Sequence, residues 1–154
     1  KVIYEDSNQN LWIGTTSGLN KFDGNTFIKY YSEPGSNSLS HNFISSITED
    51  SYGNLWIGTV HGLNHFNKET NQFTNFFHNP NDPTTISGNV IYNVIEDNSG
   101  LLWVNSYNSG INKTVRTTQE NFIRFESYPN YSGSLSHSNV LSLAEGKDRT
   151  DSSL

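Results

Sequence analysis

The chain repeats one motif three times, and this repeat limits the folds that it can adopt more than any single residue does. Each copy centres on a tryptophan, and Trp12, Trp56 and Trp103 recur at a period of roughly 40 to 50 residues. The copies read EDSNQNLWIGTTSGLNKF (5–22), EDSYGNLWIGTVHGLNHF (49–66) and EDNSGLLWVNSYNSGINK (96–113). A period of this length, built from short β-prone runs, is typical of the blades of a β-propeller.

Each copy predicts four short strands. The β-prone runs are separated by strings rich in Asn, Asp, Ser and Gly, which are turn-forming residues. Four antiparallel strands in about 45 residues make one propeller blade. The runs expected to be strands are 2–5, 11–15, 19–22 and 27–31 in the first copy, 43–49, 55–59, 63–67 and 73–77 in the second, and 90–96, 102–106, 111–115 and 122–126 in the third.

We therefore predict an all-β chain, a β-propeller segment of about three four-stranded antiparallel blades plus the first strand of a fourth. A single partial propeller domain covers 1–154, with blades at roughly 1–33, 42–79 and 89–127 and the start of the next blade at 138–146. Because closed rings have at least four blades, the chain is expected to pack against other blades of a parent propeller. The isolated chain is expected to self-associate through its exposed edges.

Composition excludes several kinds of partner. The formal net charge is −6, only 16% of residues are charged, and no cluster of Lys and Arg occurs. Nucleic acids and anionic membranes both need several cations on one face, so neither is expected as a partner. No apolar run approaches the roughly 20 residues of a membrane span, and membrane contact by this segment is not expected. The lack of cysteine excludes disulfides and zinc–thiolate sites.

Residues that recur at one phase of every copy are expected to be structural. The repeated aspartates begin tight turns, where their side chains accept hydrogen bonds from backbone N–H groups. The tryptophans are expected to pack between blades, with the indole N–H donating to a neighbouring backbone carbonyl. The glycines permit a positive φ or a close backbone approach. These structural residues are Asp6, Trp12, Gly18, Asp50, Trp56, Gly62, Asp97, Trp103 and Gly110.

No catalytic residue, metal site or cofactor is expected. The aspartate turns resemble part of a calcium loop, but no further acidic ligand follows at the required distance. Paired acids such as Glu49 and Asp50 could suggest a glycosidase, yet neighbouring residues of a strand point to opposite faces. The five histidines do not form a ligand set, and nucleophile, nucleotide-binding and kinase motifs are absent.

The string I/V-x-E-D-x-x-G-N-L-W-I-G-T-x-x-G-L-N-x-F and the SLSxN connection at 38–42 resemble the two-component regulator propeller repeat, from residue 2 to about 145. In that family, such repeats build the extracytoplasmic sensor regions of bacterial hybrid two-component systems. Two seven-bladed propellers there precede an Ig-like domain, a membrane span and a histidine kinase. The resemblance implies a partial ring of a seven-bladed propeller, a periplasmic location and the sensing of oligosaccharides. The sequence departs from the pattern at Gln9, Leu101, Asn105 and Ser106.

Ligand-binding residues are expected where the copies differ. In a propeller, the links between second and third strands and the connections between blades open on one face, the usual binding surface. The third copy has an inserted residue there, beside an aromatic ring and an amide that would suit a sugar ring and its hydroxyls. The candidate ligand-binding residues are Tyr107, Asn108, His61, Ser17, Tyr128 and Tyr131.

The sequence leaves more than one function open. The first hypothesis is a ligand-sensing module of a bacterial hybrid two-component sensor, which recognises an oligosaccharide and signals to a histidine kinase elsewhere in the parent chain. The alternative is a protein-interaction or dimerisation scaffold with no small-molecule ligand. A third hypothesis is a lyase or hydrolase propeller. An aromatic, amide-lined cleft would favour the first, a broad apolar patch the second, and convergent carboxylates or histidines the third.

Overall fold

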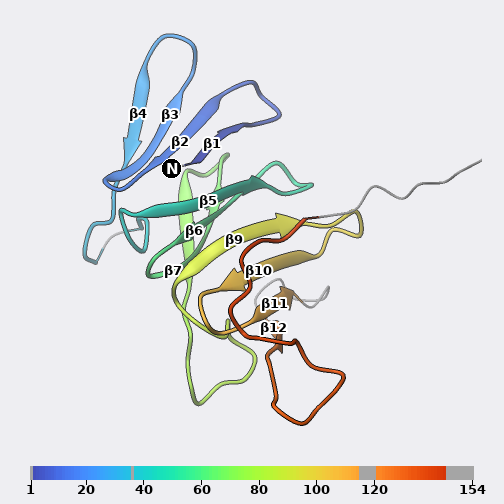
Figure 1. The fold of residues 1–154 in the computed structure, drawn as a ribbon. Helices are drawn as coiled ribbons and strands as arrows, with labels where there is room; N and C mark the ends of the chain where they lie inside the picture. Colours follow the sequence, from blue (N-terminus) through green and yellow to red (C-terminus); the bar gives the residue numbers. More distant parts are fainter. Residues whose placement is uncertain (1, 36, 115–120, 145–154) are drawn as a thin grey trace, which may run out of the picture.

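The chain folds into three antiparallel sheets that follow one another like the blades of a fan (Figure 1). The computed structural model describes residues 2–35, 37–114 and 121–144. Within these ranges there are twelve strands and no helix, and each sheet joins four consecutive strands in chain order. The all-β propeller segment predicted from the repeat is confirmed.

The strands lie close to the runs expected from the sequence. Blade 1 contains β1 (Val2–Glu5), β2 (Leu11–Thr15), β3 (Gly18–Phe22) and β4 (Phe27–Tyr30). Blade 2 contains β5 (Ile44–Glu49), β6 (Leu55–Thr59), β7 (Gly62–Asn67) and β8 (Gln72–Phe76). Blade 3 contains β9 (Ile91–Glu96), β10 (Leu102–Ser106), β11 (Ile111–Thr114) and β12 (Phe122–Phe125).

The hydrophobic core lies between blades rather than within one. We call the face of a blade that packs on the following blade its outgoing face, and the opposite one its incoming face. The first cluster joins Trp12, Leu19, Tyr30 and Leu39 on the outgoing face of blade 1 to Ile44, Ile47, Leu55, Ile57, Phe66 and Phe73 on the incoming face of blade 2. The second joins Trp56, Leu63, Phe76 and Ile86 of blade 2 to Ile91, Val94, Leu102, Val104 and Phe122 of blade 3.

Glycine allows the second strand of one blade to approach the first strand of the next blade closely. A Cβ on Gly14 would lie 2.6 Å from Ile44 Cγ2, and one on Gly58 would lie 2.8 Å from Ile91 Cγ2. Contacts of this length exclude any larger side chain unless the neighbouring strand moves. The pattern therefore fixes the spacing between β2 and β5, and between β6 and β9.

The two ends of the blades differ in what they carry. Because successive strands run antiparallel, the links β2–β3, β6–β7 and β10–β11 and the connections between blades lie at one end, which we call the link end. The turns that begin with the repeated aspartates lie at the opposite end, the turn end. Side chains at the two ends can therefore serve separate purposes.

The predicted opening strand of a fourth blade is not formed. Residues 138–144 have no strand assignment, and the rest of the predicted run, 145–146, lies outside the described residues. The segment nevertheless begins as β5 and β9 do, since Gly110 N–H donates to Ser138 O (2.8 Å) as Gly62 N–H donates to Asn89 O (2.7 Å). A strand needs a ladder partner, and the described residues supply no second strand for this one.

Candidate functional site

At the turn end, each repeated aspartate holds its own turn and its own tryptophan. Oδ1 accepts backbone N–H bonds from the residues two and four positions later. Oδ2 accepts the indole N–H of the following tryptophan, at 2.8 Å in blade 1, 3.0 Å in blade 2 and 2.7 Å in blade 3. The expected acceptor, a backbone carbonyl of a neighbour, was wrong. A carboxylate six residues earlier is a stronger acceptor and lies within reach.

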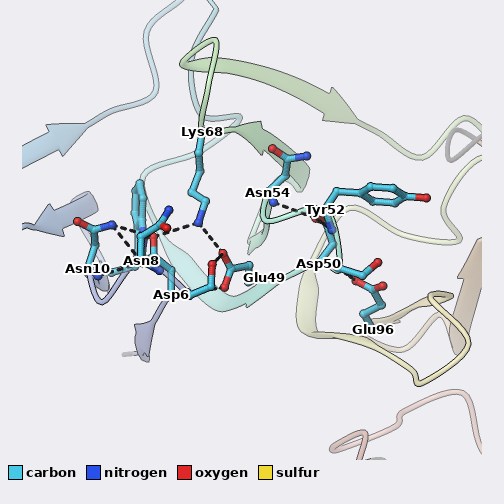
Figure 2. A network of polar contacts seen from close by, with 12 residues as sticks. Asp6, Asn8, Asn10, Glu49, Asp50, Tyr52, Asn54, Lys68 and Glu96 are labelled. Carbon is cyan, nitrogen blue, oxygen red and sulfur yellow. Dashed lines mark hydrogen bonds and ion pairs between the residues drawn. The ribbon is translucent and has the colours of Figure 1, made fainter.

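The glutamate before each of the second and third aspartates joins two blades. Glu49 accepts hydrogen bonds from Ser7 N–H (2.7 Å) and Ser7 Oγ (2.8 Å) of blade 1. Glu96 accepts one from Ser51 N–H of blade 2 (2.8 Å). In both pairs the aspartate thus acts within its own blade and the glutamate bonds to the preceding blade. Figure 2 shows the first of these pairs, Glu49 and Asp50.

Lys68 adds an ion-pair network across the first blade interface (Figure 2). Its Nζ lies 3.2 Å from Asp6 Oδ2 and also contacts Glu49 Oε1. Burial would raise the pKa of Asp6, but hydrogen bonds from Trp12, Asn10 and Lys68 outweigh it and lower this pKa to about 2. These carboxylates are therefore charged at neutral pH and engaged in the scaffold. In the described ranges no group of three acidic or histidine side chains could hold a metal ion.

The link end carries an aromatic pair in blade 3. Tyr107 follows β10 and packs on Tyr92 of β9, with ring centroids 5.2 Å apart and ring planes inclined by 42°. Both side chains are partly exposed, Tyr107 to 44% and Tyr92 to 39%. Tyr107 N–H donates to Val90 O (2.8 Å), which holds the link against the start of β9. The result is an accessible apolar surface with two phenolic hydroxyls.

Asn108 completes this group, which we call the link-end site and define as Tyr92, Tyr107 and Asn108. Asn108 is exposed and has a φ of 52°, a left-handed conformation that asparagine tolerates well. Ser109 Oγ donates to Tyr107 O (3.1 Å), and Gly110, with φ of 79°, returns the chain to β11. The longer link of the third copy thus places an exposed asparagine next to Tyr107 in the chain.

Tyr92 was not among the residues selected from the sequence. It lies on the first strand of its blade, and a tyrosine in a β-prone run indicates only a strand residue. The signal was present in the alignment, because the equivalent residue of the second copy is Ser45. A large aromatic at a position where another copy has serine is unnecessary for the blade.

The remaining candidates do not join the link-end site. Ser17 and His61 occupy equivalent links of blades 1 and 2, where their backbone N–H groups donate to Thr15 Oγ1 and Thr59 Oγ1. His61 stacks against Phe77 at 5.6 Å. Among the described residues, no hydrogen bond or ring contact connects either of them to Tyr107 or Asn108.

Tyr128 and Tyr131 lie together elsewhere, in the connection that follows β12. They line a groove of about 520 Å³ on the outgoing face of blade 3, which is otherwise formed by residues including Trp103, Phe125 and Leu135. The matching residues of blades 1 and 2 are covered by the next blade. The groove is therefore the surface on which a further blade would pack, and it is separate from the link-end site.

Stacked four-stranded blades with repeated Asp–Trp pairs define a segment of a β-propeller. Within that class, the family model described as two component regulator propeller matches residues 1–17 and 38–61. These two segments therefore match two-component regulator propeller repeats, and the resemblance read from the tryptophan motif is confirmed.

Solved structures agree with this assignment. The chain is similar to the extracellular domain of the putative hybrid two component system BT3049 from B. thetaiotaomicron, with 33% identity and a TM-score of 0.73 over 80% of the chain. It spans 18% of that protein. No match was found among the curated proteins. The described residues contain no helix able to cross a membrane.

Two solved structures of lower sequence identity support the fold assignment only. PorZ of Porphyromonas gingivalis, a surface component of the type-IX secretion system, is 15% identical, with a TM-score of 0.65 over 94% of this chain and 23% of its own. A catalytically inactive virginiamycin B lyase from Staphylococcus aureus is 13% identical, with a TM-score of 0.56 over 80% of this chain and 39% of its own.

Proposed function

We propose that this chain is part of the periplasmic ligand-sensing region of a bacterial hybrid two-component sensor. It recognises an oligosaccharide, and the parent protein passes the signal to a histidine kinase. The observation that carries the proposal is the likeness, at 33% identity, to the extracellular domain of a putative hybrid two component system. The repeat motif and the family match support the same conclusion.

The link-end site supports a sugar as the ligand. The faces of sugar rings are apolar and pack on aromatic rings, while their hydroxyls need groups that both donate and accept. Tyr92 and Tyr107 supply the rings, and Asn108 supplies an exposed amide. Lysine and arginine are absent from this group, which favours neutral over acidic oligosaccharides.

The proposed module carries out no bond chemistry. The carboxylates of the turn end are held by tryptophan, serine and lysine, so they do not face a substrate as a catalytic pair would. Signalling then requires that the ligand bind one conformation of the parent receptor better than another.

The proposal is tested by the melting temperature of the chain in the presence of neutral and acidic oligosaccharides. A ligand that binds only the folded state stabilises it by about 2.7 kcal/mol at a concentration 100-fold above its Kd. We expect a selective, concentration-dependent rise with a neutral oligosaccharide. Tyr107→Ala should weaken binding about tenfold, the effect of losing one packed aromatic ring.

Tyr52→Ala is the matched control, because Tyr52 is a 75% exposed tyrosine at the turn end. It should bind as the unmodified chain does. An equal loss in both variants would show that the link-end site is not the binding site. No rise with any oligosaccharide would contradict the sensing function and favour the alternative, a protein-interaction scaffold.

A further inference from the structure

Gly88 lies in the connection that enters blade 3, at a position where the other two connections have histidine. The three connections read SLSHNFI (38–44), TISGNVI (85–91) and SLSHSNV (134–140). In the first and third, the histidine Nδ1 accepts the backbone N–H two residues later, at 2.9 Å for both His41 and His137. Glycine cannot make this bond, and Gly88 does not have a positive φ that would require glycine. The reason for glycine here therefore lies in the space around it.

The space beside Gly88 is filled by the link between β10 and β11. A Cβ on Gly88 would lie 2.7 Å from Ser109 Oγ and 3.0 Å from Ser109 Cβ. Contacts this short exclude a side chain at position 88 unless the link moves. Ser109 belongs to the longer link, which has one residue more before its glycine than the links of the other two blades. The absent side chain of the connection and the extra residue of the link therefore share one space.

A hydroxyl of blade 3 also fastens the longer link to this connection. In blade 2, Thr59 Oγ1 donates to Gly62 O (2.8 Å), and blade 1 repeats this bond at 2.9 Å. Ser106 takes the place of the threonine in blade 3, and its Oγ donates instead to Gly88 O (3.2 Å). The hydroxyl that closes the link in the other blades thus joins the third link to Gly88.

These contacts determine the position of the exposed amide of the link-end site. Ser109 Oγ donates to Tyr107 O (3.1 Å), and Asn108, with its φ of 52°, lies between these two residues. A Cβ on Gly88 would displace Ser109 Oγ, so this bond would be lost. The backbone at Asn108 would then no longer be held in its left-handed conformation by the hydroxyl of Ser109.

We infer that Gly88 is a positioning residue of the link-end site. It leaves room for Ser109, and through Ser109 it holds the link at Asn108. Blade 2 has neither member of this pair, since His41 precedes it and its link is one residue shorter. That Asn108 then meets a sugar rests on the proposed function, whereas the positioning itself does not.

A double-mutant cycle on the full chain tests whether Gly88 and Ser109 share one space. Gly88→His should lower the melting temperature by about 4 °C, because the added side chain meets Ser109. Deletion of Ser109 shortens the link to the length found in blade 2. In that background Gly88→His should raise the melting temperature by about 2 °C, because the histidine can accept the N–H of Val90 as His41 accepts that of Phe43. Equal effects in the two backgrounds would overturn the inference.

NMR signals of Asn108 separate positioning from a general loss of stability. At a temperature where Gly88→His is fully folded, the side-chain amide signals of Asn108 and the backbone coupling that reports its φ should both change. His41→Gly, the opposite exchange at the equivalent position, is the matched control and should leave these signals unchanged. Gly88→Ala, which adds only the Cβ, replaces Gly88→His if the latter is unfolded. Asn108 signals that do not respond to a side chain at position 88 would contradict the positioning role.

Binding of maltohexaose and cellohexaose, two neutral oligosaccharides, separates this inference from the proposed function. If either binds the unmodified chain, Gly88→His should weaken its binding about tenfold, and His41→Gly should not. An unchanged affinity in Gly88→His would show that Gly88 does not position the site. If neither sugar binds, the result counts against the proposed function, while the melting temperatures and the Asn108 signals still decide the inference.

Discussion

At the scale of single residues, the turn end shows how one carboxylate can stabilise several levels of structure. Asp6 accepts hydrogen bonds from the backbone N–H of its own turn, from the indole of Trp12 and from the ammonium of Lys68, which lies in the β7–β8 turn of the next blade. Asp6 is only 4% exposed. A buried charge is stable only when it is fully paired. Removal of one partner should therefore destabilise the packing of blade 1 on blade 2.

Lys68→Met should lower the free energy of unfolding by about 1 to 2 kcal/mol at pH 7. Burial lowers the pKa of Lys68, but its bonds to Glu49 and Asp6 outweigh this and raise it. For Glu49, burial raises the pKa, and bonds from Lys68 and Ser7 outweigh this and lower it. Urea denaturation of the variant and the unmodified chain gives the difference. Lys29→Met, at an exposed lysine of β4, is the control and should change little.

The difference in the free energy of unfolding between Lys68→Met and the unmodified chain should decrease at low pH. A carboxyl whose pKa is lower in the folded state contributes stability above its unfolded pKa, and loses it as the pH falls towards the folded pKa. For Asp6 these values are 3.8 and about 2. The effect of Lys68→Met should therefore be largest above about pH 5 and shrink between about pH 4 and pH 2. A difference that is constant with pH would show that the side chain acts by packing alone.

At the scale of elements, the repeat predicts strands well because each copy presents the same alternation of apolar and turn-forming residues. The strands of all three blades lie where their runs were expected, and no strand end differs by more than one residue. The fourth-copy strand fails for a physical reason. A run such as 138–144 has strand-forming residues but lacks a ladder partner among the described ones. The local sequence pattern predicts the tendency of a segment to form a strand, but not whether a partner strand is present.

Glycine acts in two separable ways in the connections within a blade, as Gly110 of the β10–β11 link and Gly24 of the β3–β4 turn show. Gly110 has a φ of 79°, and a Cβ there would lie 2.1 Å from Phe125 O. Gly24 has a φ of 98°, but a Cβ would meet nothing within 4 Å. Gly110→Ala should therefore lower the free energy of unfolding by about 2 kcal/mol or more, and Gly24→Ala by only about 1 kcal/mol.

Thermal or urea unfolding of both variants measures the difference between them. Equal losses would mean that backbone conformation alone matters at these glycines. A larger loss in Gly110→Ala would show that the close approach of β12 to the link is itself a constraint on the third blade.

At the scale of the whole molecule, the contacts that could not be predicted from the sequence are those between neighbouring blades. Lys68 reaches Asp6 across 62 positions, and no motif relates the two. The link-end site could be predicted in part, because Tyr107 and Asn108 stand at an insertion. The alignment of the copies marks Tyr92 as unusual, because Ser45 is its equivalent, but only the structure shows that its ring packs on Tyr107. Tyr128 and Tyr131 were grouped with the ligand face because their connection is long, but they lie on the open blade face.

The measurement that tests the proposed function most directly is an NMR titration of tyrosine side-chain signals with the oligosaccharide that raises the melting temperature. Tyr92 and Tyr107 should shift together as the ligand is added, with one shared Kd, while Tyr52 and Tyr131 stay constant. Shifts at Tyr128 and Tyr131 alone would place the ligand on the outgoing face of blade 3. A titration in which no tyrosine signal moves would contradict the account of this chain as an oligosaccharide sensor that binds through its link-end site.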